Sequence, residues 1–121
     1  MTPRPSGLDF DAVTRLAQRL PESEVGSSYG TPALKVKKKL FARLWEDGET
    51  LVLKLPFVVR DHLIATDPDV FFLTDHYRDH PYVLVHLPRI TEATLAPLLE
   101  ESWRQVAPTR LQLQLPRDER A

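Results

Sequence analysis

Apolar residues recur along this chain at two different spacings, and the spacings divide it into helices and strands. Leu8–Leu20, Val58–Ala65 and Glu92–Val106 each place apolar side chains three and four positions apart, the spacing of an amphipathic helix. Asp9 precedes the first of these segments and Thr91 the last, and both residue types cap helix N-termini. Three helices with apolar stripes are therefore expected.

Other segments alternate apolar and polar residues or carry β-branched and aromatic runs, which indicates strands. The predicted strands are Ala33–Val36, Leu40–Trp45, Thr50–Leu55, Val70–Thr74 and Tyr82–Leu87. Asp47 and Gly48 join the second and third strands in a tight hairpin, because Asp-Gly supplies the positive φ values of such turns. The polar segments 22–28 and 75–81 are expected to be loops.

The order of predicted elements is α-β-β-β-α-β-β-α, which indicates an α+β fold with helices packed against a twisted antiparallel sheet. A length of 121 residues suits a single domain over 1–121. Strict alternation within the second strand defines two faces. One face holds Leu40, Ala42 and Leu44, and the other holds Phe41, Arg43 and Trp45. Alternating leucine and glutamine over 111–115 predicts a short extended segment.

Composition narrows the class of protein. The chain has no cysteine, which excludes disulfides and Cys-ligated zinc. No apolar run of about 18 residues occurs, so neither a membrane span nor a membrane partner is expected. The polar residues 1–7 leave no apolar core for a signal peptide, and a cytoplasmic protein is expected.

Charge is nearly balanced overall but uneven along the chain. The 16 basic and 17 acidic residues give a net charge of −1, whereas a protein that holds duplex DNA usually has a basic excess. Residues 35–43 nevertheless carry five positive charges and no negative one: Lys35, Lys37, Lys38, Lys39 and Arg43. On a hairpin, these side chains are candidates for contacts with phosphates, next to an aromatic surface for single-stranded bases. The alternative is that they only solubilise a turn and protect a sheet edge.

A second set of polar and aromatic residues is expected to converge if two loops meet at one end of the sheet. This candidate pocket for an anion or small ligand consists of Tyr29, Thr31, Lys54, His76, Tyr77 and Arg78. The alternative is that Tyr29 and Tyr77 pack only for structural reasons. The cluster Asp75, His76, Asp79 and His80 lies on a predicted loop, so no metal site is expected from it.

Motifs of catalysis are missing from the sequence. It contains no Gly-x-Ser-x-Gly elbow, no phosphate-binding loop and no Gly-x-Gly-x-x-Gly. We therefore expect a protein without catalytic residues and without a cofactor.

Several segments, in order, resemble a known family. They are Ser28–Ala33, Lys39–Ala42, Leu51–Pro56, Phe71–Thr74, His76-Tyr77, Tyr82–Leu87 and a last helix with Leu98-Leu99 and Trp103. Together they resemble the MmcQ/YjbR family of small bacterial domains over about residues 8–110, whereas 111–121 form a tail without a clear counterpart. The resemblance implies a fold similar to type III secretion chaperones, and DNA binding through β-hairpins. It leaves open a protein- or ligand-binding module with no DNA role, or a chaperone-like homodimer.

Overall fold

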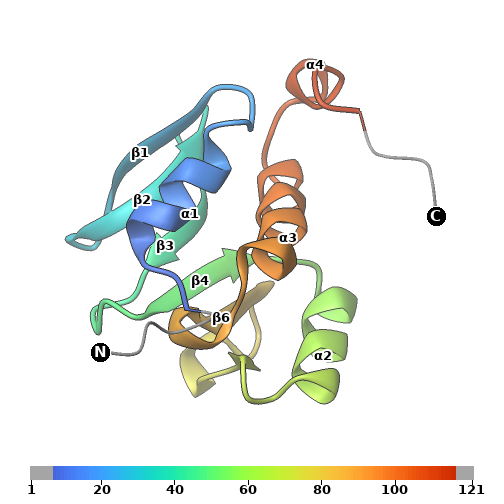
Figure 1. The fold of residues 1–121 in the computed structure, drawn as a ribbon. Coiled ribbons are helices and arrows are strands. Elements are labelled where there is room, and N and C mark those ends of the chain that lie inside the picture. The colour runs from blue at the N-terminus through green and yellow to red at the C-terminus, as the bar shows by residue number, and fades with distance from the viewer. Residues whose placement is uncertain (1–6, 117–121) are drawn as a thin grey trace.

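One twisted antiparallel sheet is the framework of the computed structural model, which describes residues 7–116 (Figure 1). Its six strands lie in the order β1-β2-β3-β4-β6-β5. Their bounds are β1 Ser23–Ser28, β2 Thr31–Val36, β3 Lys39–Leu44, β4 Thr50–Lys54, β5 Phe71–Phe72 and β6 Tyr82–His86. The helices are α1 Phe10–Ala17, α2 Phe57–Thr66, α3 Glu92–Arg104 and α4 Thr109–Gln112, with 3-10 turns at Asp75–Tyr77 and Leu87–Arg89.

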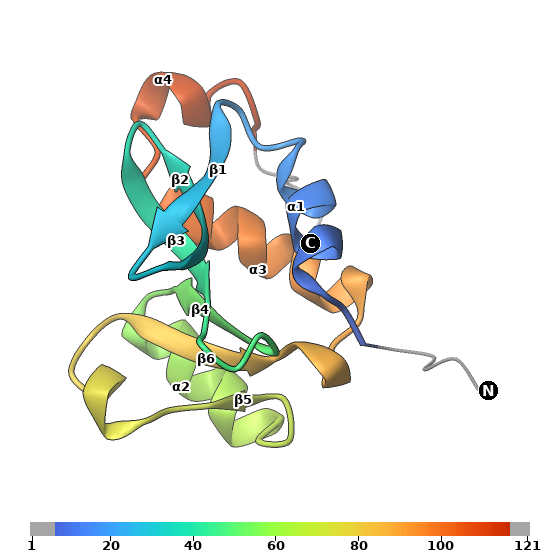
Figure 2. The same cartoon turned by 90° about the vertical axis from the view of Figure 1, so that its left-hand side faces the viewer.

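The helices cover one face of the sheet. Figure 2 shows α1 and α3 on the same side of the sheet, where the two helices contact each other and α3 contacts β3 and β4. Val59 and Leu63 of α2 pack on the same core. Residues that alternate along β4 and β6 separate the two faces. Leu51, Leu53, Val83 and Val85 belong to the core under the helices, whereas Val52 and Leu84 belong to a smaller cluster with Tyr77 on the opposite face. The predicted α+β fold with an antiparallel sheet is confirmed.

The strand β1 was predicted to be a loop. Its sequence Ser-Glu-Val-Gly-Ser-Ser has one large apolar residue, Val25, and that side chain is 57% exposed. The strand forms because its backbone pairs with β2 over the whole length, from Ser23 opposite Val36 to Ser28 opposite Thr31. An edge strand that buries no apolar face gives no alternating signal, so sequence pattern alone misses it.

The predicted distribution of β3 side chains between the two sheet faces is wrong, because the strand contains a β-bulge. Leu34 pairs with Ala42, but the next residue of β2, Lys35, pairs with Leu40, so Phe41 is an extra residue. Phe41 is consequently turned into the main core, where it is fully buried next to Ala42. Strict alternation had placed Phe41 with Arg43 on the other face. Because a bulge shifts the alternation by one position, Leu40 and Arg43 lie on that face instead.

The tail after α3 also differs from the prediction. Residues 109–112 form the short helix α4 rather than an extended segment. Leu111 is fully buried, and Leu115 packs on the same core. The two leucines are four residues apart, and this spacing is compatible with a helical turn as well as with a strand. Gln112 fixes this turn, since its Nε2 donates to the carbonyl oxygens of Arg104 and Ala107 at 3.1 and 2.9 Å. Residues 117–121 lie outside the described part of the chain.

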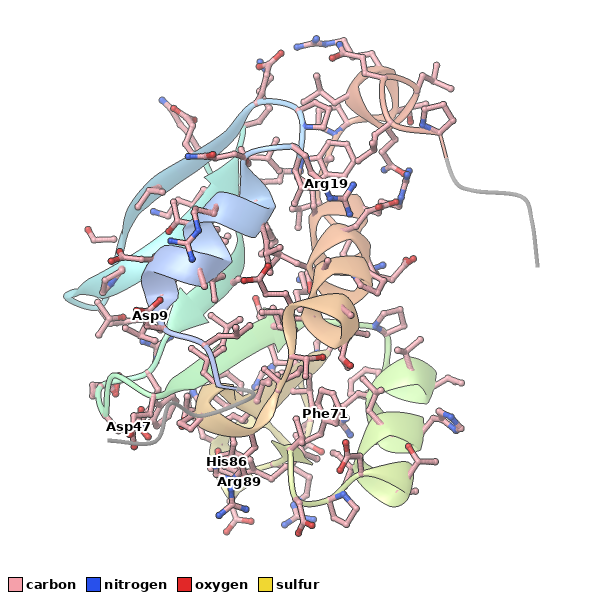
Figure 3. The ribbon with its side chains drawn as sticks, in the orientation of Figure 1. Asp9, Arg19, Asp47, Phe71, His86 and Arg89 are labelled. Carbon is pink, nitrogen blue, oxygen red and sulfur yellow. The ribbon has the colours of Figure 1, made fainter. Side chains whose placement is uncertain are left out.

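The β3–β4 turn depends on one carboxylate, which Figure 3 labels at the tip of the turn. Asp47 Oδ1 accepts hydrogen bonds from the backbone N–H groups of Glu49 and Thr50, both at 2.9 Å, and Oδ2 accepts from Thr50 Oγ1 at 2.7 Å. Burial raises the pKa of Asp47, but these hydrogen bonds lower it more, so the pKa lies below the ordinary value for an aspartate.

Asp47→Ala is expected to lower the free energy of unfolding by about 1–2 kcal/mol at neutral pH, because the turn loses three acceptor contacts. A carboxyl group whose pKa is lower in the folded state than in the unfolded state stabilises the protein when the pH is above the unfolded-state pKa. This stabilisation is lost as the pH falls through the folded-state pKa. The difference between variant and wild type should therefore shrink as the pH falls below the ordinary range of an aspartate pKa. Urea denaturation across pH tests this, with the exposed Asp69→Ala as control; a pH-independent difference contradicts it.

Candidate functional site

The β2–β3 turn presents lysines in an uncommon backbone conformation. Lys37 and Lys38 have φ values of 51° and 69°, the left-handed pair required by a two-residue hairpin turn. Glycine or asparagine adopts this conformation at lower cost than lysine. The turn therefore carries charged side chains at positions where turn geometry alone favours other residues. Lys37, Lys38 and Lys39 are all exposed.

The predicted basic cluster is divided between the two sides of this hairpin. Lys35 lies opposite Glu24 of β1, and its stem crosses Gly26. Lys35 and Lys38 line a shallow hollow of about 300 Å³ with residues of β1. Lys37 and Lys39 instead line a different pocket, at the end of the sheet. The lysines thus form two pairs rather than one surface.

Arg43, the fifth predicted member, lies apart from the lysines. It is 6% exposed, and its guanidinium lies over the rings of Tyr29 and Trp45, 5.3 and 5.1 Å from their centroids. Its Nη1 donates to Thr31 Oγ1 at 3.1 Å and to Glu46 Oε1 at 3.2 Å. Burial lowers the pKa of Arg43, but contacts with Tyr77 and Glu46 raise it overall. A guanidinium held in this way is a structural anchor and is not available to phosphates beside the lysines.

We call the pocket at the end of the sheet the basic pocket; it has a volume of about 580 Å³. Residues of the β2–β3 turn, the end of β4 and the connection from α3 to α4 line it. Figure 2 shows the β2–β3 turn next to α4. Four cationic residues line it, Lys37, Lys39, Lys54 and Arg104, and no acidic residue does within residues 7–116. Lys54 joins Lys39 here because β3 and β4 are antiparallel, so the start of one strand meets the end of the other.

The four cations of the basic pocket are not equally free. Lys37 Nζ lies 2.5 Å from Glu22 Oε1, and its hydrogen bond is the main cause that lowers the pKa of Glu22. Arg104 is buried and donates through Nε and Nη2 to Glu100 Oε2 at 3.0 and 2.8 Å. Lys39 and Lys54 form no ion pair with the described residues. These two lysines are therefore its most available charges.

Glu100 ties the wall of the basic pocket to α1. Besides Arg104 it pairs with Arg19, whose Nη2 lies 2.8 Å from Glu100 Oε1, and Figure 3 shows Arg19 beside α3. Burial raises the pKa of Glu100, but the two arginines lower it more. The carboxylate thus neutralises Arg104, and the charge of that arginine is mostly used inside the fold.

A second pocket, the aromatic pocket, lies on the sheet face away from the helices and has a volume of about 300 Å³. It is lined by Tyr29, Leu40, Arg43, Val52, His76, Tyr77, His80 and Tyr82. The structure thus brings together three residues of the predicted ligand pocket, Tyr29, His76 and Tyr77. Arg43, His80 and Tyr82 were missed, because their approach depends on the bulge in β3 and on the fold of the 75–81 loop.

The other three predicted pocket residues lie around the aromatic pocket rather than in its lining. Thr31 does not line the pocket, but its Oγ1 accepts a hydrogen bond from Nη1 of Arg43, which does. Lys54 Nζ lies 5.2 Å from the centroid of the Tyr82 ring and faces the basic pocket. Arg78 points to solvent, where its Nη2 lies 2.7 Å from Asp75 Oδ1. Of these three, only Lys54 is placed to act in a binding site.

The rings of the aromatic pocket support one another. Tyr77, which is buried, makes edge contacts with His76 and Trp45 at centroid distances of 4.7 and 5.9 Å, and a tilted contact with Tyr82 at 5.5 Å. Burial is the main cause that raises the pKa of Tyr82, with contributions from Tyr77 and Tyr29. The phenol of Tyr82 is therefore protonated at neutral pH.

Arg60 of α2 fixes the loop that carries the pocket histidines. Its Nη1 donates to the carbonyl oxygens of Tyr77, Arg78 and His80 at 3.3, 3.0 and 2.8 Å. The side chain is 6% exposed and its guanidinium lies 4.7 Å from the centroid of the Phe57 ring. An arginine in an amphipathic segment is expected to face solvent, so no sequence pattern indicates this role.

No group of three or more His, Cys, Asp or Glu side chains within residues 7–116 lies close enough to hold a metal ion. In the same part of the chain, no helix is both long and apolar enough to span a membrane.

The fold defines a small α+β domain with two pockets at its sheet. A family model described as YjbR matches residues 18–105, and the chain belongs to this family. The curated relatives are an uncharacterised protein of Mycobacterium bovis and uncharacterised proteins of two Mycobacterium tuberculosis strains. Each is 42% identical over 53 residues, which is 44% of this chain. The match covers 41% of each relative, so the chain aligns with less than half of their length.

A solved structure extends the comparison of folds to nearly the whole chain. A crystal structure of a Deinococcus radiodurans protein with a DUF419 domain superposes with a TM-score of 0.74 at 20% identity. The superposition covers 93% of this chain and 91% of that one. At this identity the likeness shows the shared fold alone.

Proposed function

We propose that this protein binds the sugar-phosphate backbone of nucleic acid at the basic pocket, without a catalytic step. One observation carries the proposal: Lys37, Lys39 and Lys54 converge on one pocket that has no acidic side chain among its described lining residues. A cluster of ammonium groups at a concave surface attracts phosphates even when the net charge of the chain is near zero, because the local field decides the contact.

The C-terminal end of α3 would oppose an anion without further groups, since its free carbonyl oxygens carry partial negative charge. Gln112 reduces this effect, because it donates to the carbonyl oxygens of Arg104 and Ala107. Thr109 and Gln105 add polar groups to the lining. The wall is thus compatible with phosphate.

The number of charges sets the strength of such binding. Contact of about three lysines with phosphates gives a slope of log affinity against log salt of about −2 to −3. Affinity is then expected in the range of non-specific binding, about 10⁻⁴ to 10⁻⁶ M at physiological salt. No side chain of the basic pocket is positioned to suggest base-specific reading, so the proposal includes no sequence preference.

Removing the two unpaired lysines should weaken binding most. Lys39→Gln with Lys54→Gln is expected to reduce the salt slope by about 2 and to lower affinity at low salt about tenfold or more. The matched control is Lys35→Gln with Lys38→Gln, which removes the same charge from the opposite side of the hairpin and should have a smaller effect. Fluorescence anisotropy with labelled single- and double-stranded oligonucleotides across a salt series measures both.

Two results would contradict this proposal. Equal losses in the two double variants would mean that only the total charge matters, not the basic pocket. Binding that does not respond to salt, or no binding at low salt, would exclude the backbone as the ligand and would favour the protein- or small-ligand-binding alternative.

A further inference from the structure

We infer that the aromatic pocket receives one unpaired nucleobase while the neighbouring basic pocket holds the backbone, so that the protein prefers single strands over duplex. This inference rests on the proposed function and adds the form of nucleic acid that is bound. It is carried by the lining of the aromatic pocket and by its connection with the basic pocket.

The first observation is an exposed aromatic ring that has the Arg43 guanidinium over it and is otherwise open to solvent. Tyr29 occupies the two-residue turn between β1 and β2 with a φ of 53°, and it is 87% exposed although it lines the pocket. The rings of His76, Tyr77 and Tyr82 line the same pocket and contact one another in a connected row. A lining rich in planar rings suits a planar ligand, and stacking on aromatic side chains tolerates any base.

The second observation is that the two pockets adjoin. Lys54 lines the basic pocket, Tyr82 lines the aromatic pocket, and they are register partners of β4 and β6 with the ammonium group over the ring. The two pockets also adjoin along β3, where Lys39 lines the basic pocket and its neighbour Leu40 lines the aromatic pocket. A nucleotide whose phosphate contacts Lys54 or Lys39 can therefore place its base on the aromatic side.

The third observation distinguishes a base from an anionic aromatic ligand. The positive charge beneath the pocket, Arg43, already donates to Thr31 and Glu46, and Glu46 balances its charge. What remains for a ligand are the imidazoles of His76 and His80 and the hydroxyl of Tyr29, which match the donors and acceptors at the edge of a base. A volume of about 300 Å³ is at the small end for ligand pockets and suits one base rather than a stack of several.

Duplex nucleic acid cannot use this pocket in the same way. Its bases are stacked and paired, and extruding one has a cost that an unpaired strand does not have. The backbone contact is shared by both forms, but the stacking contact is available only to the single strand. The preference for single strands thus depends on Tyr29 and its neighbours and not on the lysines.

The test compares three labelled probes by fluorescence anisotropy: an oligothymidylate, an abasic strand of the same length and a duplex. Wild type is expected to bind the oligothymidylate about tenfold more tightly than the abasic strand. Tyr29→Ala should remove most of this difference without changing the salt slope, and Tyr29→Phe, which keeps the ring, should behave like wild type. Because Tyr29 is exposed, the alanine variant is expected to fold normally.

The outcomes separate the two proposals. Binding that depends on Lys39 and Lys54 but is equal for the abasic and ordinary strands overturns the base pocket and leaves the backbone proposal standing. If the oligonucleotides do not bind, a second measurement tests the aromatic pocket directly. Thymidine 5′-monophosphate is titrated into the protein while the backbone amide chemical shifts are followed by NMR. Shifts confined to Tyr29, His76 and His80 would support base binding in the aromatic pocket without the backbone proposal. The absence of shifts would overturn base binding in the aromatic pocket too.

Discussion

Trp103→Ala is expected to lower the free energy of unfolding by about 3–5 kcal/mol, the range for truncating a large buried aromatic residue. Trp103 lies near the end of α3, is fully buried and belongs to the core that α1, α3 and the sheet share. Its indole Nε1 also donates to the carbonyl oxygen of Pro21 at 3.1 Å, just after α1. One side chain thus fills the core and links the two helices, and alanine removes both contributions.

Two further variants separate these contributions to the effect of Trp103. Trp103→Phe keeps an aromatic ring but removes the donor to Pro21, so a loss of about 1–2 kcal/mol is expected. The other tryptophan, Trp45, is partly exposed and packs on the smaller cluster, so Trp45→Ala should cost less than half as much as Trp103→Ala. Urea denaturation followed by far-UV circular dichroism avoids changes in tryptophan fluorescence. A loss below about 1.5 kcal/mol for Trp103→Ala would contradict its role in the core.

The helices were predictable because their signals are local. Asp9 and Thr91 cap α1 and α3 as their residue types suggest, with Asp9 Oδ1 accepting from Ala12 N at 3.0 Å and Thr91 Oγ1 from Thr94 N at 3.2 Å. The third predicted helix began at the correct residue, Glu92, and ran two residues too far. Capping and spacing act within a few residues of chain, so a single sequence contains them.

The strand details were less predictable because they depend on partners. β1 exists through backbone pairing with β2, and its own side chains are polar or exposed. The bulge at Phe41 follows from the register of β2 against β3 and leaves no mark in the alternation of the sequence. A one-residue shift reverses the face of every following side chain, so this unseen bulge decided where Leu40 and Arg43 lie.

The candidate site shows the same division. That lysines lie at the β2–β3 turn followed from the sequence, but which of them share a pocket followed from the sheet. Lys54 is 15 residues after Lys39 in the printed sequence, and antiparallel pairing of β3 with β4 places both in the basic pocket. Tyr29 was expected to lie near His76 if the loops that carry them meet at one end of the sheet. The aromatic pocket is lined by both residues.

Arg60→Met is expected to lower the free energy of unfolding by about 2–4 kcal/mol and to loosen the loop of the aromatic pocket. Methionine has a similar length, but the variant leaves three carbonyl oxygens, of Tyr77, Arg78 and His80, without their shared donor. Hydrogen bonds from a charged group contribute about 1.5–3 kcal/mol each, and three bonds to one nitrogen are not additive. The expected loss is therefore larger than that of one bond and smaller than the sum.

The loosening of the loop distinguishes this role of Arg60 from general packing. Hydrogen exchange should accelerate in the Arg60→Met variant at the amides of residues 76–82, and much less in β4, whose backbone pairs with β3 and β6 on both sides. The matched control is Arg78→Met in the same loop, because that side chain is exposed and forms its ion pair with the exposed Asp75 among the described residues. Its effect on stability should be much smaller than that of Arg60→Met. Uniformly faster exchange throughout the sheet would show that Arg60 supports the whole fold, and the rigid loop of the aromatic pocket would then need another cause.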